Sequence, residues 1–176
     1  PKGIGALYVR PEWGAVLQPL QFGGGHERGL RSGTLPVHQI VGLGSACGLA
    51  SAEGEADARR IARLRERLWN GLRDLPGVLL NGHAAQRVAG ILNLSFTGVE
   101  GESLLMSLPQ LALSSGAACN SDTDEPSYVL RALGRDPQTA QASLRFSLGR
   151  FSSEADVDLA IEVVRREVPR LRAVAP

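Results

Sequence analysis

The chain has 176 residues, which is enough for one domain, or one domain with part of another, to bury a core without metal or disulfide support. Charged residues make up 21% and the net charge is +1, so no global field favours nucleic acid or an anionic membrane, and we expect neither as a partner. No apolar run reaches the length of a membrane span. The two cysteines, Cys47 and Cys119, are too few for a disulfide framework, so the sequence predicts a cytoplasmic protein.

The first part of the chain predicts a strand, a loop and a helix. Residues 4–9 (IGALYV) favour a β-strand. Residues 21–35 are rich in glycine, follow no helical or strand period, and are expected to form a loop. A helix should follow, with Thr34 as its cap and Pro36 at an early helical position. Its buried inner face would carry Ile40, Leu43, Gly44 and Cys47.

A second helix is expected over residues 55–75, because apolar residues recur there at steps of three and four. Pro76 and Gly77 follow and should end it. The remaining elements before the last helix are shorter. We expect helices at 100–108 and 126–133, and strands at 78–80, 91–96, 111–113 and 143–148.

The last helix is expected to begin near Ser153, with Asp156 as its capping-box partner, and Pro169 should kink or end it. This order of elements predicts an α+β layered domain, preceded by a strand and a loop that belong to a larger one. We therefore divide the chain into the tail end of a larger domain, a connecting helix and a small domain, at residues 1–35, 36–54 and 55–176.

Cys119 lies among small and polar residues in the segment 113–122 (LSSGAACNSD). A loop of this composition can expose a thiol and let it move, as a reactive cysteine requires. Composition alone also allows an inert loop cysteine, and a persulfide or redox thiol stays open. No metal site is expected, because Cys47 and the three histidines show no ligand spacing. No cysteine-protease signature surrounds Cys119.

Three stretches together resemble the C-terminal half of the cysteine desulfurases. They are residues 23–34 (GGGHERGLRSGT), 114–119 (SSGAAC) and 144–151 (LRFSLGRF), and residues 93–96 (NLSF) and 100–104 (EGESL) lie between them. These enzymes are pyridoxal-phosphate enzymes of the class V aminotransferase group that supply sulfur for iron–sulfur clusters. The cysteine loop is similar to that of the housekeeping subgroup. The resemblance implies the C-terminal small domain of a fold-type-I pyridoxal-phosphate enzyme, with the last strand and loop of its large domain.

The resemblance also implies roles for individual residues. Cys119 matches the thiol that takes sulfur from L-cysteine as a persulfide, leaving L-alanine. Arg145 matches the arginine that grips the substrate carboxylate, and Arg150, its competitor, is interpreted as structural. Thr34 matches a threonine that reaches the cofactor phosphate of the adjacent subunit, which implies a homodimer. Three further motif members receive no individual role: His26, Glu27 and Arg31.

Lys2 is the only lysine in the chain and matches a non-catalytic lysine of these enzymes. The lysine that attaches the cofactor lies in a Ser-x-His-Lys segment just upstream, so we expect it before Pro1 and expect the 176 residues alone to be inactive. The partner implied is a cluster scaffold or sulfur-acceptor protein, although residues 10–21 are less basic than in the bacterial housekeeping enzymes. Two alternatives stay open, a selenocysteine lyase and a non-catalytic module that carries persulfide.

Overall fold

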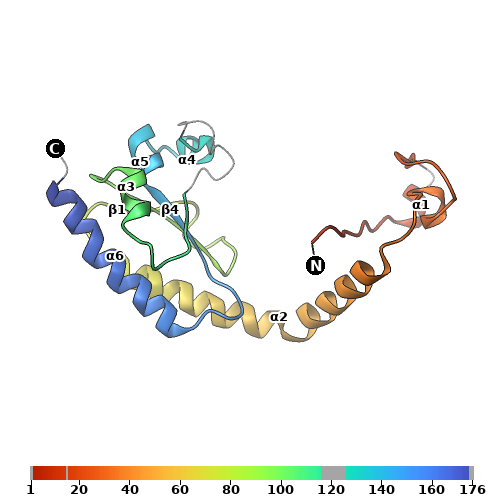
Figure 1. Cartoon of the computed structure of the whole chain (residues 1–176), viewed down its shortest axis with the longest axis horizontal. Helices are drawn as coiled ribbons and strands as arrows, with labels where there is room; N and C mark the ends of the chain where they lie inside the picture. The colour runs from red at the N-terminus through yellow and green to blue at the C-terminus, as the bar shows by residue number, and fades with distance from the viewer. Residues whose placement is uncertain (1, 15, 116–125, 175–176) are drawn as a thin grey trace. The chain divides into compact units, whose positions relative to one another are not determined.

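The computed structural model describes residues 2–14, 16–115 and 126–174, and Figure 1 traces their helices and strands. The chain forms two compact units, Pro1–Glu55 and Ala56–Pro176. A single helix, α2 (Val37–Leu72), contributes to both. Within the described ranges, every helix is too short or too polar to cross a membrane.

The first unit holds α1 (Pro11–Gly14), the 3-10 turn η1 (Glu27–Gly29) and the start of α2. The prediction of a strand at residues 4–9 is wrong, because these residues form no strand within the described part of the chain. A strand needs a neighbour to pair its backbone N–H and C=O groups, and no described residue pairs with this segment.

The prediction of two helices after the glycine-rich loop is also wrong, because α2 is one helix of 36 residues. The expected junction contains Gly48 and Gly54 but no proline, and a single glycine weakens a helix by about 1 kcal/mol without breaking it. The predicted inner face is not buried either, since Cys47 is exposed and Ile40 is 39% exposed. The buried residues of α2 lie instead toward its C-terminal end, in the second unit: Leu64, Leu68 and Leu72.

The second unit is built on a four-stranded antiparallel sheet with the order β1-β2-β4-β3. Three strands confirm the predicted positions: β1 (Val78–Leu80), β2 (Ile91–Phe96) and β4 (Ser143–Ser147). The fourth, β3 (Ser114–Ser115), begins one residue after the predicted strand at 111–113 ends. Leu111 and Leu113 pack against the core instead of pairing with β4, which moves the strand onto the two serines.

Two helices cover one face of this sheet. The C-terminal part of α2 and helix α6 (Glu154–Val174) run side by side along it, as Figure 1 shows. Alternate strand residues point to this face and are buried: Leu92, Leu94, Phe96, Leu144 and Phe146. They meet the leucines of α2 and the apolar stripe of α6: Val157, Ala160, Val163, Val164 and Val168. This core fixes which side of each strand faces away from the helices.

Charged pairs on the surface join α6 to α2 and to the turn that follows α2. The Arg67 guanidinium donates to Asp158 at 2.7 Å, and the Arg165 guanidinium donates to Asp74 at 2.6 Å. The hydrogen bond from each arginine lowers the pKa of its partner carboxyl below the ordinary value. Exposed pairs of this kind contribute little to stability, so the apolar core decides the packing.

Short helices with side-chain caps complete the second unit. They are α3 (Gly101–Met106), α4 (Tyr128–Ala132) and α5 (Pro137–Gln141). At the start of α3, the Glu100 carboxylate accepts hydrogen bonds from the Glu102 and Ser103 amides, which lowers the pKa of Glu100.

The start of α6 confirms the predicted capping box. The Ser153 amide donates to the Asp156 carboxylate at 2.8 Å, and the Asp156 amide donates to the Ser153 hydroxyl at 3.2 Å. Pro169 does not end α6, which continues to Val174. A proline removes one hydrogen bond from a helix. The helix nevertheless continues past Pro169, and the neighbouring Val168 is buried in the core.

Replacing Gly101 with alanine should destabilise the second unit. An added Cβ would lie 2.4 Å from the Gln141 carbonyl oxygen, so α3 and α5 would have to move apart. We expect Gly101→Ala to lower the free energy of unfolding by about 1–3 kcal/mol in urea denaturation of the 176-residue chain. Gly54→Ala is the control, because a Cβ there meets nothing within 4 Å, and it should raise stability by up to about 1 kcal/mol. A Gly101→Ala chain as stable as the wild type would contradict this packing.

Candidate substrate-binding site

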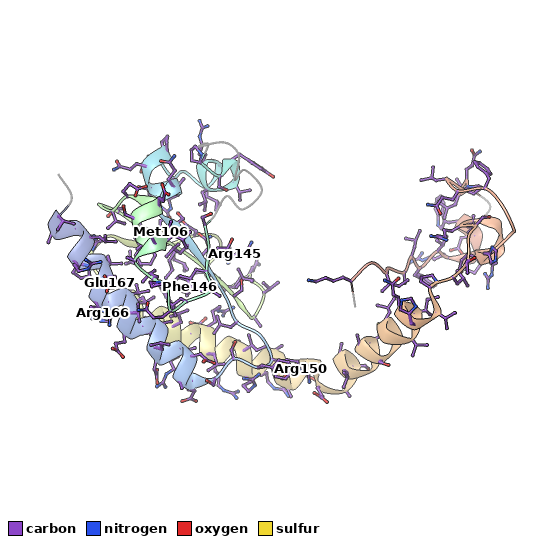
Figure 2. All side chains as sticks on the ribbon, viewed as in Figure 1. Met106, Arg145, Phe146, Arg150, Arg166 and Glu167 are labelled. Atoms are coloured by element: carbon purple, nitrogen blue, oxygen red, sulfur yellow. The ribbon has the colours of Figure 1, made fainter. Side chains whose placement is uncertain are left out.

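Arg145 projects from the face of the sheet opposite to α2 and α6. It lies on β4 beside Phe146, and Figure 2 marks the two as neighbours on that strand. Phe146 is 4% exposed in the core, whereas Arg145, on the opposite face, is exposed. No described residue forms an ion pair or hydrogen bond with the Arg145 side chain. Such a guanidinium is free of the acidic partners that the structure describes and can grip an anion.

Arg145 belongs to a line of four residues across the sheet, which we name the polar row. The strand register places Asn93 of β2 and Ser114 of β3 opposite Arg145 on its two sides. Asn81, which follows β1, extends the same register, because its amide donates to the Asn93 carbonyl at 3.0 Å. The polar row is therefore Asn81, Asn93, Arg145 and Ser114, and it contains no acidic side chain.

A buried hydrogen-bond chain supports one end of the polar row. The Arg135 Nε group donates to Asn81 Oδ1 at 2.7 Å, and Arg135 also donates to the Leu80 carbonyl at 2.9 Å. Asn81 is 6% exposed, and its Nδ2 group donates to Asn93 Oδ1 and to Ser95 Oγ, each at 2.7 Å. Buried polar groups are costly unless they are paired, and these contacts pair them.

The same hydrogen-bond chain continues across this face of the sheet toward α5. The Ser95 and Ser143 hydroxyls lie 2.7 Å apart, and the Ser143 hydroxyl donates to the Thr139 carbonyl at 2.9 Å. Since Ser143 uses its hydrogen on Thr139, Ser95 must donate to Ser143 and accept from Asn81. Arginine can only donate and a carbonyl can only accept, so both ends of the chain fix its direction.

Arg150 has the structural contacts that the sequence interpretation gave it. Its side chain pairs with Asp57 of α2 at 3.5 Å and lies over the Phe151 ring at 5.7 Å. Its carbonyl accepts a hydrogen bond from Arg60. These contacts hold the end of β4 against α2, so Arg145 is the arginine of this segment that faces outward without such partners.

Cys119 lies outside the described residues. It follows Ser114 by five residues, and Ser114 pairs directly with Arg145. A chain of five residues spans at most about 18 Å, so the sequence ties the thiol to the neighbourhood of Arg145. The Ser114 hydroxyl donates to the Ser115 carbonyl at 3.0 Å, which takes its only hydrogen.

Thr34 lies in the first unit and is exposed. The prediction that it caps the following helix is wrong, because α2 begins at Val37 and the Pro36 carbonyl accepts the first hydrogen bonds, from Gln39 and Ile40. Pro36 thus lies just before the helix, and Thr34 is two residues too early to cap it. Its hydroxyl is therefore not used to cap the helix, and a hydroxyl in this position can donate to a phosphate.

The loop before Thr34 has an unusual backbone. Gly33 has φ +115°, and the non-glycine residues Glu27 and Arg28 have φ +52° and +57°. Such left-handed non-glycine residues cost about 1 kcal/mol or more each and gather at ligand sites. The Arg31 guanidinium donates to the Ser32 carbonyl at 3.0 Å, and His26 precedes η1 without a capping bond. The structure thus gives Arg31 a local contact and leaves the roles of His26 and Glu27 unassigned.

Three residues of the candidate site received no role from the sequence: Asn81, Asn93 and Arg135. One signal was available: asparagine is disfavoured inside strands, yet Asn93 stands in the middle of residues 91–96, which were correctly expected to form one. Asn81 and Arg135 gave no such signal, because their partnership joins residues 54 positions apart.

The chain is similar to known proteins along its whole length. The model of the class-V aminotransferase family matches residues 1–159. The chain belongs to this family. Cysteine desulfurase IscS of Pectobacterium atrosepticum is 57% identical over 176 residues, which make up 100% of this chain and 44% of that protein.

Two solved structures share the fold. A NifS-like protein from Rickettsia africae matches with a TM-score of 0.74 and 26% identity, over 87% of this chain and 40% of that one. The structure of SspA in complex with cysteine matches with a TM-score of 0.62 and 31% identity, over 87% and 42%. These findings confirm the predicted fold class and the resemblance to cysteine desulfurases. The chain spans less than half the length of these relatives.

Removing Arg135 should destabilise the second unit through Asn81. In Arg135→Met the buried Asn81 Oδ1 atom would lose its donor, which we expect to cost about 1–3 kcal/mol of unfolding free energy. Arg131→Met is the matched control, because Arg131 is an exposed arginine of α4 and should change stability by less than about 0.5 kcal/mol. Urea unfolding of both chains measures the difference, and equal effects would refute the supporting role of Arg135.

Proposed function

We propose that this chain is part of a pyridoxal-phosphate-dependent cysteine desulfurase, which converts L-cysteine to L-alanine and takes the sulfur onto Cys119. One observation carries the proposal. Arg145 is exposed, has no acidic partner among the described residues, and pairs with Ser114, five residues before Cys119. The sequence thus ties a cysteine to within five residues of the strand that pairs with Arg145.

Arg145 supplies the grip on the substrate. A guanidinium offers two parallel N–H donors that match the two oxygens of a carboxylate. The identity with the IscS protein and the likeness to SspA, whose structure contains cysteine, support L-cysteine as the molecule that carries this carboxylate. With the carboxylate held at Arg145, the sulfur of the substrate is free to face the loop that bears Cys119.

Cys119 then acts as the nucleophile. Its thiolate attacks the substrate sulfur, an S–S bond forms, and the carbon–sulfur bond breaks with its electron pair left on the carbon, which becomes L-alanine after protonation. Pyridoxal phosphate, when bound, supplies the electron sink for that bond cleavage. A segment whose sequence predicts a loop suits the task, because the persulfide must afterwards reach an acceptor.

The remaining assignments extend the same proposal. The Thr34 hydroxyl, exposed just before α2, would hold the cofactor phosphate of an adjacent subunit, which makes the working enzyme a homodimer. The resemblance to the housekeeping cysteine desulfurases extends the proposal to iron–sulfur cluster assembly, with a scaffold or sulfur-acceptor protein as partner and the cytoplasm as location. The identity with proteins named cysteine desulfurase IscS supports that resemblance.

The thiol assignment is tested in the complete enzyme that carries this segment. We expect Cys119→Ser to lower alanine release from L-cysteine more than about a hundredfold and to abolish the protein persulfide detected by mass spectrometry. Cys47→Ser is the matched control, since Cys47 is the other cysteine and lies exposed on α2. Full desulfurase activity in Cys119→Ser would disprove the assignment, and retained activity only toward L-selenocysteine would favour a selenocysteine lyase.

The 176-residue chain alone should not turn over. Lys2 is its only lysine, and the Lys2 carbonyl contacts Gln39 of the first unit at 3.2 Å, in a segment that matches a non-catalytic lysine. Purified chain incubated with pyridoxal phosphate and L-cysteine should release no more alanine than its Cys119→Ala variant, while the complete enzyme serves as the positive control. Release above that variant would show that Lys2 or another group supports catalysis.

A further inference from the structure

Asn93 occupies the centre of the polar row and has no role in the mechanism described so far. It lies in the interior of β2, where asparagine fits poorly because it neither packs well nor favours the strand backbone. Its side chain is half-buried, with Asn81 on one side of the row and Arg145 on the other. A residue so placed at the cost of strand propensity invites a functional explanation.

The hydrogen bonds determine which way the Asn93 amide faces. Arg135 can only donate, so the atom of Asn81 that it contacts must be Oδ1, and the Nδ2 group of Asn81 must face Asn93 and Ser95. Because Asn81 donates to Asn93, the atom of Asn93 on that side must be its oxygen. The NH₂ group of Asn93 is therefore turned away from Asn81.

This orientation leaves two N–H donors of Asn93 without an acceptor in the described part of the chain. The next residue in the row is Arg145, which has only donors. Directly paired residues of neighbouring antiparallel strands have their Cβ atoms about 4.5–5.5 Å apart, so one small anion can contact both side chains. Ser114 adds no competing donor, because its hydroxyl hydrogen is used on Ser115.

We propose that Asn93 is a second substrate-binding residue, whose side-chain NH₂ group donates to the carboxylate that Arg145 holds. This inference rests on the proposed function for the identity of the ligand, an α-amino acid. Arg145 supplies charge and Asn93 supplies a fixed direction, so the two together orient the carboxylate rather than only attract it.

A purely structural role for Asn93 makes a different prediction. The structural contact uses only Oδ1, which accepts from Asn81. Aspartate has the same shape and keeps that acceptor, so Asn93→Asp preserves the contact and replaces the donor with a negative oxygen. Asn93→Ser removes the donor without adding a charge, and so shows whether aspartate acts merely by capturing Arg145.

The experiment uses the complete enzyme and compares ligands with and without a carboxylate. We expect both Asn93 variants to raise the KM for L-cysteine and the Kd for L-alanine about tenfold or more, with Asn93→Asp the larger effect. The Kd of ethylamine, which lacks the carboxylate, should stay within about twofold. Arg145→Lys should show the same dependence on the carboxylate. Ser147→Ala is the matched control, because Ser147 is exposed on the same face of β4 and should leave every constant unchanged.

The outcomes separate the two proposals. Wild-type turnover of L-cysteine with unchanged constants in Asn93→Asp would overturn the Asn93 assignment alone. Equal weakening of L-alanine and ethylamine would also overturn it, because a structural defect does not depend on the carboxylate. If the wild type binds L-alanine but produces no alanine from L-cysteine, the proposed function fails. In that case, a selective loss of affinity for L-alanine in both variants would still support the Asn93 assignment.

Discussion

The antiparallel register between β2 and β4 is the constraint on which the site depends. It pairs Leu92 with Phe146 on the face that α2 and α6 cover, and it pairs Asn93 with Arg145 on the opposite face. A slip of one residue would carry the buried apolar side chains into solvent and drive Arg145 into the core. Arg145 is therefore positioned by the burial of its neighbours and needs no contact of its own, which leaves its guanidinium for a ligand.

A second constraint holds the flanks of the segment that bears Cys119. On one side, Ser114 and Ser115 pair with β4. On the other side, α4 leads to Arg135, which bonds Asn81 at the far end of the polar row. Both flanks are thus tied to the same sheet. A buried network in which every polar group has a hydrogen-bond partner tends to specify one arrangement of its residues. The contacts of Asn81 therefore fix the position of Arg135 as well as stabilise it.

Periodicity was sufficient to predict most elements of the second unit, although it did not predict α5 and placed β3 three residues too early. The alternation in residues 91–96, the leucine spacing of α2 and the Ser153–Asp156 capping pair are local patterns, and the structure confirms each of them. The failures share a physical cause. A strand at residues 4–9 and a buried Cys47 both require a neighbouring element, and periodicity does not say whether one is present.

The residues of the candidate site also differ in whether the sequence could reveal them. Arg145 was found through a motif, since family resemblance records a residue's position but not its surroundings. The partnership of Asn81 with Arg135 is invisible in the sequence, because the two residues are far apart and either alone resembles an ordinary surface residue. Their importance depends on the direction of donors and acceptors, which only the folded arrangement fixes.

Local rules are broken most clearly where the polar row faces solvent. An asparagine inside a strand and an exposed arginine paired only with neutral residues both contribute little to stability, and apolar or β-branched residues would suit those positions better. Sites that bind ligands are where such departures from local preference gather. Because Arg145 and the NH₂ group of Asn93 are both donors, and the polar row contains no acid, these two departures agree on one kind of ligand, a small anion. This agreement is a stronger argument than either residue gives alone.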